Sequence, residues 1–352
     1  MSKIIGVHIP DGIKNYLING DMAISQRGTS FAAIATGVYS LDRYRYIKTG
    51  AMVHTITQDT DVPSLAQSGY LFRNSLRLNL TTPDTSIAAG DFASIQQYIE
   101  GYNWANLAQK NMTVSFWVKA TLPGTYCMSF VNTGNDRSYI AEYTISGAST
   151  WEYKTITIPA SPSAGTWNYT NGIGLRLSWN LVAGTTYQTT AGAWQTGNFL
   201  ASNNQTNGTN TGATDFRLTG VMLNEGTTAF PFRLFGTGSQ DEMVACERYY
   251  EKSYDYAFAP GSTAVNGFFQ LAGNANGNNF GTVFYKTRKR SQSTVTYYNP
   301  VTGTSGELRN VTTAANAASS ALEPSETCFH TAAYGNGAND QIHLHWVADS
   351  EL

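Results

Sequence analysis

The sequence predicts an all-β protein, in which an antiparallel jelly-roll β-sandwich is followed by a short helix and a smaller C-terminal β domain. Three observations support this fold class. Apolar and polar residues alternate with a period of two in many short segments before residue 235. Gly-, Asn- and Thr-rich turns separate these segments, as is typical of sandwiches and jelly rolls. Apolar residues with the spacing of an α-helix are clear only after residue 238, so a single helix is expected among the strands.

The strands of the first domain, 15–235, are expected in the following order, after an N-terminal arm at 1–14. Residues 15–29 form one short strand that runs into a polar turn at 26–29. In 112–118, Val114 and Phe116 alternate with Ser115 and Trp117, which marks a half-buried strand. Further strands are predicted at 126–130, 139–145, 151–158, 175–181 and 216–223. Residues 84–109 are ambiguous between a helical turn and a loop, and 198–215 are expected to form a long exposed loop.

A linker helix is expected at 236–255, before a C-terminal β domain at 256–352. Ser239 and Glu242 have the spacing of a capping box. Cys246, Tyr250 and Tyr254 follow at helical spacing, so the helix is expected to run to Tyr254. Strands are then predicted at 283–285, 295–298 and 341–346.

Composition and charge argue against several classes of partner. The chain has 22 basic and 24 acidic residues and only 13% charged residues, about half the usual share of roughly 25%. Nucleic-acid-binding domains usually carry a basic face, so no nucleic-acid partner is expected. No apolar run is long enough for a membrane helix, and no secretory signal is evident. Cys127, Cys246 and Cys328 form neither a disulfide framework nor a metal-ligand pattern, and no cofactor is expected.

Several motifs together resemble bacteriophage tail-fibre or minor structural proteins whose first domain is like a carbohydrate-binding module. The opening at 15–29 is similar to N-x-L-I-N-G-D-x-x-I-x-Q-R-G-T. The other matching segments are Leu41-Asp-Arg-Tyr44, Thr113-Val-Ser-Phe-Trp-Val-Lys119, Ala191-Gly-Ala-Trp-Gln-Thr-Gly-Asn198, Gly220-Val-Met-Leu-Asn-Glu-Gly226 with Ala229-Phe-Pro-Phe232, Cys246-Glu-Arg-Tyr-Tyr-Glu-Lys252 and His345-Trp-Val-Ala-Asp349.

The resemblance implies a virion protein made in the host cytoplasm, and specifically a tail-fibre or receptor-binding subunit that attaches to a host surface glycan. By analogy it is expected to form a homotrimer and to contact other virion proteins. The sequence departs from the family at Asn224, where an acidic residue is expected, and at Met222, where a Gln is expected. A calcium ion needs several oxygen ligands, and this sequence does not supply them around Asp21, so no metal site is predicted.

Aromatic residues in turn-rich segments are the candidate glycan-binding residues. Rings present flat apolar faces that pack against sugars, and polar neighbours can bond the hydroxyls. The candidates are Tyr102, Trp104, Trp167, Tyr187 and Trp194. The alternative for each is core packing, and core packing is expected for Trp179, which is in phase with Leu177 and Leu181.

Two other functions remain open beside the adhesin. A structural or decoration subunit of a capsid, collar or baseplate would bury its aromatic residues. A polysaccharide depolymerase would need two facing carboxylates, but the available ones form no motif and no enzyme is predicted. These carboxylates are Asp84, Asp91, Glu100, Asp136, Glu142 and Glu152.

Two further clusters favour structural interpretations. His343 and His345 share one face of a predicted strand. They could bind a metal in a symmetric assembly, but surface or inter-subunit histidines are favoured. The basic run at 286–290 is expected to be a solvated hairpin edge.

Overall fold

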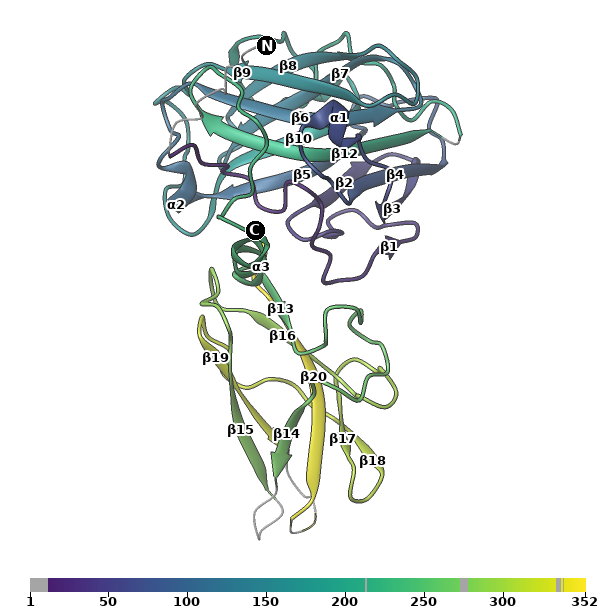
Figure 1. Ribbon diagram of the computed structural model, residues 1–352, viewed down its shortest axis with the longest axis vertical. Helices are drawn as coiled ribbons and strands as arrows, with labels where there is room; N and C mark the ends of the chain where they lie inside the picture. The colour runs from purple at the N-terminus through teal and green to yellow at the C-terminus, as the bar shows by residue number, and fades with distance from the viewer. Residues whose placement is uncertain (1–11, 213, 273–277, 334–336, 338) are drawn as a thin grey trace, which may run out of the picture. The chain divides into compact units, whose positions relative to one another are not determined.

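The computed structural model describes residues 12–352, apart from 213, 273–277, 334–336 and 338 (Figure 1). Contacts divide the described chain into two compact units. The first unit contains the chain up to Ala23, Ala32–Val38 and Tyr44–Ser239. The second contains Ile24–Phe31, Tyr39–Arg43 and Gln240–Leu352. The second unit therefore includes two short segments that the sequence placed in the first domain. Most of the predicted arm, 1–14, lies outside the described residues.

Two antiparallel sheets form the first unit, as expected for a jelly-roll sandwich (Figure 1). The sheet that we call the β12 sheet contains, in spatial order, β3 (Val53–Asp59), β4 (Ser75–Thr82), β12 (Asp215–Glu225), β6 (Met112–Ala120) and β9 (Glu152–Ile158). The sheet that we call the β10 sheet contains β11 (Trp194–Thr196), β8 (Arg137–Ile145), β7 (Gly124–Asn132), β10 (Ile173–Ala183), β5 (Phe92–Glu100) and β2 (Arg45–Thr49).

The core of the first unit lies between these sheets and is set by the alternation in the sequence. On β6, Val114 and Phe116 are fully buried, whereas Trp117 is only half-buried on the opposite face. On β10, the buried Trp179 meets Phe116 edge-on, with ring centroids 6.0 Å apart. The prediction that Trp179 is a core residue is confirmed. The remaining faces of both sheets point away from this core, because successive side chains on a strand alternate.

The segment that opens the family resemblance is not a strand; it is an irregular segment fixed against β12. The Asn15 side chain accepts bonds from the backbone nitrogens of Leu17 and Leu223, both at 3.0 Å. It donates to the carbonyl oxygen of Val221 at 3.2 Å. A Cβ atom at Gly20 would lie 2.1 Å from that same oxygen, so only glycine fits there. The predicted strand at 15–29 is wrong, because Asn15 and Gly20 bond irregularly to β12 and residues 24–29 belong to the second unit.

Short helical turns connect the strands of the first unit. They are α1 (Leu65–Ser68), α2 (Gly101–Trp104) and the 3-10 turn η1 (Thr185–Tyr187). Ser64 caps α1, and its side chain and that of Gln67 form a capping box. No helix among the described residues is both long enough and apolar enough to cross a membrane.

The second unit is built around its last strand. β20 (Gln341–Asp349) pairs with four other strands: β13 (Tyr250–Lys252), β14 (Phe269–Ala272), β16 (Thr294–Tyr298) and β17 (Glu307–Asn310). β17 also pairs with β18 (Ala315–Ala318), and β15 (Asn279–Phe284) pairs with β19 (Cys328–Ala333). Tyr297, Phe329 and Trp346 pack together in the core of this unit. The two-residue strand β1 (Ser30–Phe31) ends the segment 24–31.

The predicted linker helix is shorter than expected. α3 spans Ser239–Glu247, and the chain then forms β13, whose Tyr250 pairs with Asp349. The helical spacing of Tyr250 and Tyr254 is therefore misleading, because pairing with β20 overrides the local pattern. The side chains of Tyr250 and Tyr254 are both buried.

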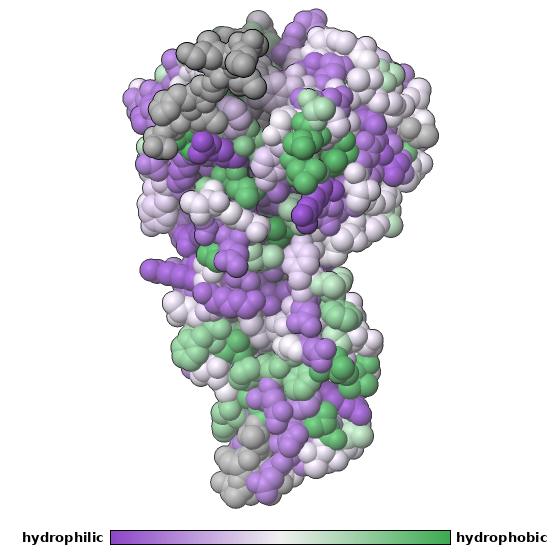
Figure 2. Space-filling view, viewed as in Figure 1, coloured by the Kyte–Doolittle hydropathy of each residue, from purple (hydrophilic) through white to green (hydrophobic). Residues whose placement is uncertain are grey.

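Apolar side chains also reach the surface of both units. Tyr153 is exposed on the first unit, and Phe280 and Phe284 are exposed on the second. Figure 2 shows hydrophobic residues in patches among hydrophilic ones on the visible faces of the two units. Scattered apolar exposure is normal, so only patches that also form grooves are considered further.

Candidate functional site

Three of the five predicted aromatic residues come together. Trp104 and Trp167 stack with centroids 5.2 Å apart, and Trp167 meets Trp194 edge-on at 5.9 Å. The indole nitrogens of Trp167 and Trp194 donate to the backbone oxygens of Ala164 and Pro159, each at 3.1 Å. The first bond lies within one loop, and the second joins β11 to the segment that follows β9.

The burial of these aromatic residues separates them into different roles. Trp104 is completely buried, because Trp167 covers it. A direct ligand contact by Trp104 does not agree with this burial. Trp167 and Trp194 are half-buried, and Tyr102 is exposed on α2. Tyr187 lies apart from the tryptophan cluster, against Phe92 at a centroid distance of 4.9 Å.

Tyr187 lines a groove on the outer face of the β10 sheet, which we call the β10-face groove. Residues of β2, β5 and β10 that point away from the core form its floor, and the segment after β10 forms its wall. The cleft has a volume of about 230 Å³. Its lining residues are Arg45, Ile47, Phe92, Gln96, Tyr98, Arg176, Tyr187, Asn198 and Leu200.

The wall of the groove is formed by the chain between β10 and residue 202, which folds back over the sheet. Leu200 and Ala201 pack on Cys127 and Ile140, which lie on the outer face of β7 and β8. The Asn180 side chain donates to the backbone oxygen of Leu200 at 2.6 Å. This segment therefore covers part of the sheet and leaves the β2–β5–β10 part open. The segment 198–215 was predicted to be a long exposed loop, but much of it packs against the rest of the first unit. Ala201, Ser202 and Thr209 in this segment are buried.

The polar side chains of the groove are already oriented by bonds to one another. Arg45 donates to the Tyr98 hydroxyl at 3.1 Å, and this hydroxyl donates to Gln96 Oε1 at 2.9 Å. Arg176 donates through Nη2 to Asn198 Oδ1 at 2.6 Å. The Nε atom of Arg176 is buried and has no partner among the described residues. Burial lowers the pKa of Arg176.

A second groove lies on the outer face of the β12 sheet, on the opposite side of the sandwich; we call it the β12-face groove. Its volume is about 610 Å³. Aromatic rings dominate it: Trp117 and Tyr153 lie 5.4 Å apart between centroids, beside Tyr70. The other lining residues are Gln67, Ser68, Gly69, Ala229, Phe230, Pro231 and Phe232. This groove is larger but has fewer polar groups than the β10-face groove.

The carboxylates that a depolymerase would need serve local structure. Asp136 accepts from the backbone nitrogen of Thr166 at 3.1 Å, and Glu152 accepts from that of Gly147 at 2.7 Å. Asp84 and Asp91 likewise accept from the backbone nitrogens of Ala51 and Ala88, and Glu142 accepts from the side-chain amide of Asn204. None of the six candidates lines either groove. The prediction that the chain is not an enzyme stays a prediction.

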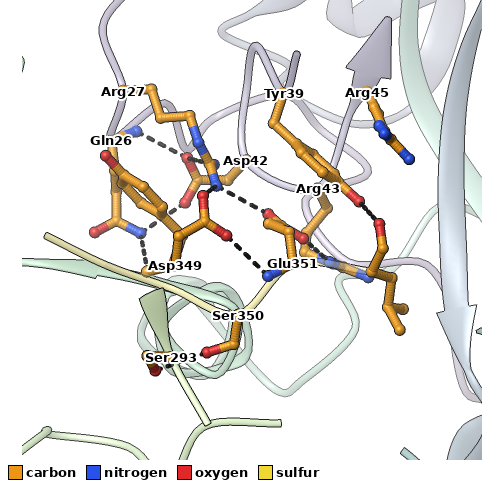
Figure 3. A network of polar contacts seen from close by, with 12 residues as sticks. Gln26, Arg27, Tyr39, Asp42, Arg43, Arg45, Ser293, Asp349, Ser350 and Glu351 are labelled. Atoms are coloured by element: carbon orange, nitrogen blue, oxygen red, sulfur yellow. Dashed lines mark hydrogen bonds and ion pairs between the residues drawn. The ribbon is translucent and has the colours of Figure 1, made fainter. Parts of the chain in front are cut away.

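A buried network of ion pairs in the second unit contains several of the motif residues on which the family resemblance rests (Figure 3). Gln26 donates through its backbone and side-chain nitrogens to the two carboxylate oxygens of Asp42, at 2.9 and 2.6 Å. Arg27 lies 3.3 Å from Glu351 and 3.7 Å from Asp42. Arg43 also forms an ion pair with Glu351. The segments 24–31 and 39–43 are thus fixed to the end of the chain.

Two aromatic rings complete this network. The guanidinium carbons of Arg27 and Arg43 lie 3.6 and 3.5 Å from the ring centroids of Tyr250 and Tyr249. Burial raises the pKa of Glu351, and the two arginines act against that rise. Burial alone would lower the pKa of Arg27 and Arg43, but Glu351 raises both, so they stay charged. These motif residues therefore stabilise the second unit and do not line either groove.

Two other predictions about charged residues in the second unit need correction. His345 is fully buried and stacks on Tyr254 at 3.8 Å between ring centroids, so it is not a surface histidine. His343 stacks on Phe268 at 4.0 Å. In the basic run, Lys289 is also fully buried and pairs with Glu251, so this run is not simply a solvated edge. The described residues contain no group of three or more His, Cys, Asp or Glu residues that could hold a metal.

Comparisons with known proteins identify carbohydrate-binding modules among similar structures. No protein-family model matches the chain, and no curated protein sequence does. A CBM4 module shares 14% identity over 59% of this chain and 98% of its own, with a TM-score of 0.33. TmCBM61, solved with β-1,4-galactotriose, shares 11% identity over 60% of this chain and 99% of its own, with a TM-score of 0.30.

A family 11 carbohydrate-binding module from Clostridium thermocellum was solved with a β-1,3-1,4-mixed-linked tetrasaccharide. It shares 9% identity over 58% of this chain and 99% of its own, with a TM-score of 0.28. Identities and TM-scores at this level do not establish the ligand of this chain. The function must therefore be argued from the grooves themselves.

Proposed function

We propose that this protein binds a glycan in the β10-face groove. The observation that carries the proposal is the convergence of an aromatic wall and oriented polar side chains in one cleft. Tyr187 on the wall and Phe92 on the floor provide the aromatic surface. The half-buried Arg45 and Asn198 provide hydrogen-bonding groups in the same cleft. Sugars present both apolar C–H faces and hydroxyls, so a binding site needs both kinds of surface.

The arrangement favours binding because little order must be created when a ligand enters. The bond from Arg45 to Tyr98, and the bond from Tyr98 to Gln96, already fix these side chains. The Tyr187 backbone oxygen accepts from the Leu200 nitrogen at 2.8 Å, which fixes the wall. Preorganised side chains lose less conformational entropy on binding.

The test is binding of the full-length protein to a panel of bacterial surface polysaccharides, followed by two tyrosine variants. Tyr187→Ala is expected to weaken binding at least tenfold, the equivalent of about 1.4 kcal/mol. Tyr153→Ala in the β12-face groove is the matched control, and it should retain wild-type affinity. If Tyr153→Ala abolishes binding while Tyr187→Ala leaves it intact, the assigned groove is wrong. Failure to bind any polysaccharide would favour the structural or decoration subunit.

We also propose that the protein acts as a receptor-binding subunit of a phage virion and forms a homotrimer. The support is the resemblance of its motifs to tail-fibre proteins. Three copies of a weak groove would bind a repetitive polysaccharide far more firmly than one copy. Light scattering of the purified protein should give three times the chain mass, and a monomer would contradict the trimer. Peptide mass spectrometry of purified particles tests the virion assignment, which its absence from the particles would overturn.

A polysaccharide depolymerase remains the enzymatic alternative, and the same panel addresses it. Released fragments would be measured in the reactions that show binding. Binding without fragments is expected, because the six candidate carboxylates lie outside both grooves. Fragment release would require a pair of carboxylates elsewhere in the chain.

A further inference from the structure

The β10-face groove is closed at both ends, because the wall contacts the floor in two places. At one end, Tyr187 of the wall meets Phe92 of the floor, with ring centroids 4.9 Å apart. At the other end, Nη2 of Arg176 donates to Asn198 of the wall at 2.6 Å. Phe92 is the first residue of β5, whereas Arg176 pairs with Tyr98 near the end of that strand. A sugar chain can therefore leave the groove at either end only by passing over one of these contacts.

The volume of the groove limits how much of a ligand it can hold. The cleft measures about 230 Å³, which is below the roughly 300–1,000 Å³ of sites that bury drug-sized ligands. It is larger than a cavity of roughly 150 Å³ that holds benzene. A pyranose ring has as many ring atoms as benzene and carries hydroxyl groups in addition. The cleft therefore has room for one sugar ring with its hydroxyls, but not for two linked residues.

The groups that a ligand can reach also suit a single ring. Tyr187 and Phe92 are half-buried and form one aromatic surface at one end of the cleft. The half-buried Arg45 and Asn198 offer hydrogen-bonding groups in the same space. The other aromatic residue among the described lining residues, Tyr98, is buried. The cleft therefore offers one surface on which a sugar ring can stack, and its lining offers no second surface for a neighbouring ring.

We propose that the β10-face groove binds a single sugar residue at the end of a glycan chain, and not an internal stretch of the chain. The proposal rests on the glycan-binding function inferred above and adds the part of the glycan that is recognised. The terminal ring packs on Tyr187, and the rest of the chain leaves the cleft toward solvent. An internal residue has a neighbour on each side, and the two closed ends leave no room for both neighbours within the cleft.

The first experiment measures how affinity depends on chain length. A disaccharide and a hexasaccharide with the same terminal residue are prepared from each polysaccharide that binds the full-length protein. A site for one terminal residue contacts the same ring in both, so their dissociation constants should agree within about threefold. A hexasaccharide that binds at least tenfold more tightly would overturn the single-residue proposal while leaving glycan binding intact. If no polysaccharide of the panel binds, the proposed function itself is contradicted.

The second experiment varies the number of chain ends. Partial hydrolysis of a linear polysaccharide raises the number of ends per unit mass without changing the sugar residues. At equal mass, the hydrolysed polysaccharide should compete for the protein more strongly than the intact one, in proportion to the number of ends. Equal competition by the intact and hydrolysed forms would refute the recognition of chain ends.

A variant then tests the closed end. Asn198→Ala removes the acceptor of the Arg176 bond and opens that end of the groove. The hexasaccharide should therefore gain affinity relative to the disaccharide, and this ratio is independent of any overall loss of affinity. The matched control is Asn204→Ala, because the Asn204 side chain is exposed and donates to Glu142 outside the groove. A wild-type ratio in folded Asn198→Ala protein would refute the argument that the closed end excludes longer chains.

Discussion

Glu351→Gln is expected to destabilise the second unit strongly, because it removes the anion shared by two buried arginines. Glu351 forms ion pairs with both Arg27 and Arg43, and the Arg43 side chain is only 1% exposed. Removing one partner of a buried ion pair costs about 3–5 kcal/mol, because the remaining charge is left uncompensated. Gln retains an acceptor oxygen and nearly the same volume. We therefore expect a loss of about 3 kcal/mol, the lower end of that range.

Hydrogen exchange read by mass spectrometry is the assay, because it resolves the effect along the chain. A loss of about 3 kcal/mol lowers protection by more than about a hundredfold. The loss should appear in peptides from β20 and β13, and also in the distant segments 24–31 and 39–43. Peptides from β6 and β7 in the first unit should keep their protection. This joint response is the signature of one network connecting segments far apart in sequence.

A matched control separates this network from an ordinary surface pair. Glu225→Gln also removes one carboxylate charge, but Glu225 and its partner Lys110 are each 49% exposed. Exposed pairs contribute less than about 1 kcal/mol. If Glu351→Gln costs no more than Glu225→Gln, the buried network does not stabilise the unit and the reasoning is wrong.

Three further predictions concern other buried features. Gly20→Ala should destabilise the first unit by more than about 2 kcal/mol in urea unfolding, because the new Cβ atom would collide with a backbone oxygen. Gly90→Ala is the control and should be nearly neutral, because a Cβ atom there meets no atom within 4 Å. Equal losses of stability in the two variants would contradict the collision. Burial lowers the pKa of His54 to about 4, below its unfolded value of about 6.5. The contribution of His54 to the free energy of unfolding is therefore fully present above pH 6.5 and is lost as the pH falls to about 4, a loss of roughly 3 kcal/mol. His54→Gln should remove this part of the pH dependence of unfolding. An unchanged pH profile would exclude His54 as its source. Lys289→Met should lower the free energy of unfolding by about 3–5 kcal/mol in urea unfolding, because Glu251 is left buried and unpaired. Adding Glu251→Leu to this variant should recover most of the lost stability. A double variant that is no more stable than Lys289→Met would refute the pairing argument.

The alternating strands could be predicted from the sequence because one face of each is apolar. The predicted strand at 112–118 lies within β6, and that at 175–181 lies within β10. β5 escaped the same reasoning, because residues Ala93 to Glu100 are buried on both faces and show no alternation. Its outward residues Gln96 and Tyr98 are buried by contacts with each other, with Ser94 and with Arg45, which the sequence pattern does not reveal. The missing strand is therefore the one that forms much of the groove floor.

The candidate site was only partly predictable for a related reason. Tyr187 was recognised as an aromatic residue in a turn-rich segment, and it lines the β10-face groove. Arg45 and Arg176 were not recognised as site residues, because single arginines on separate strands look like ordinary surface residues. Only the pairing of β2 and β10 with β5 brings them together. An arginine in phase with polar residues opposite a leucine row, as Arg176 is, was the available clue.

The discontinuous composition of the second unit has a consequence for its synthesis on the ribosome. Gln26, Arg27, Asp42 and Arg43 are translated long before Glu351, with which Arg27 and Arg43 form ion pairs. The second unit therefore cannot complete its native contacts until Glu351 has been translated, and closing such distant contacts slows folding. Residues 24–43 must remain available throughout that time. For the same reason, a graft that transfers residues 240–352 to another protein would need to carry these early segments with it.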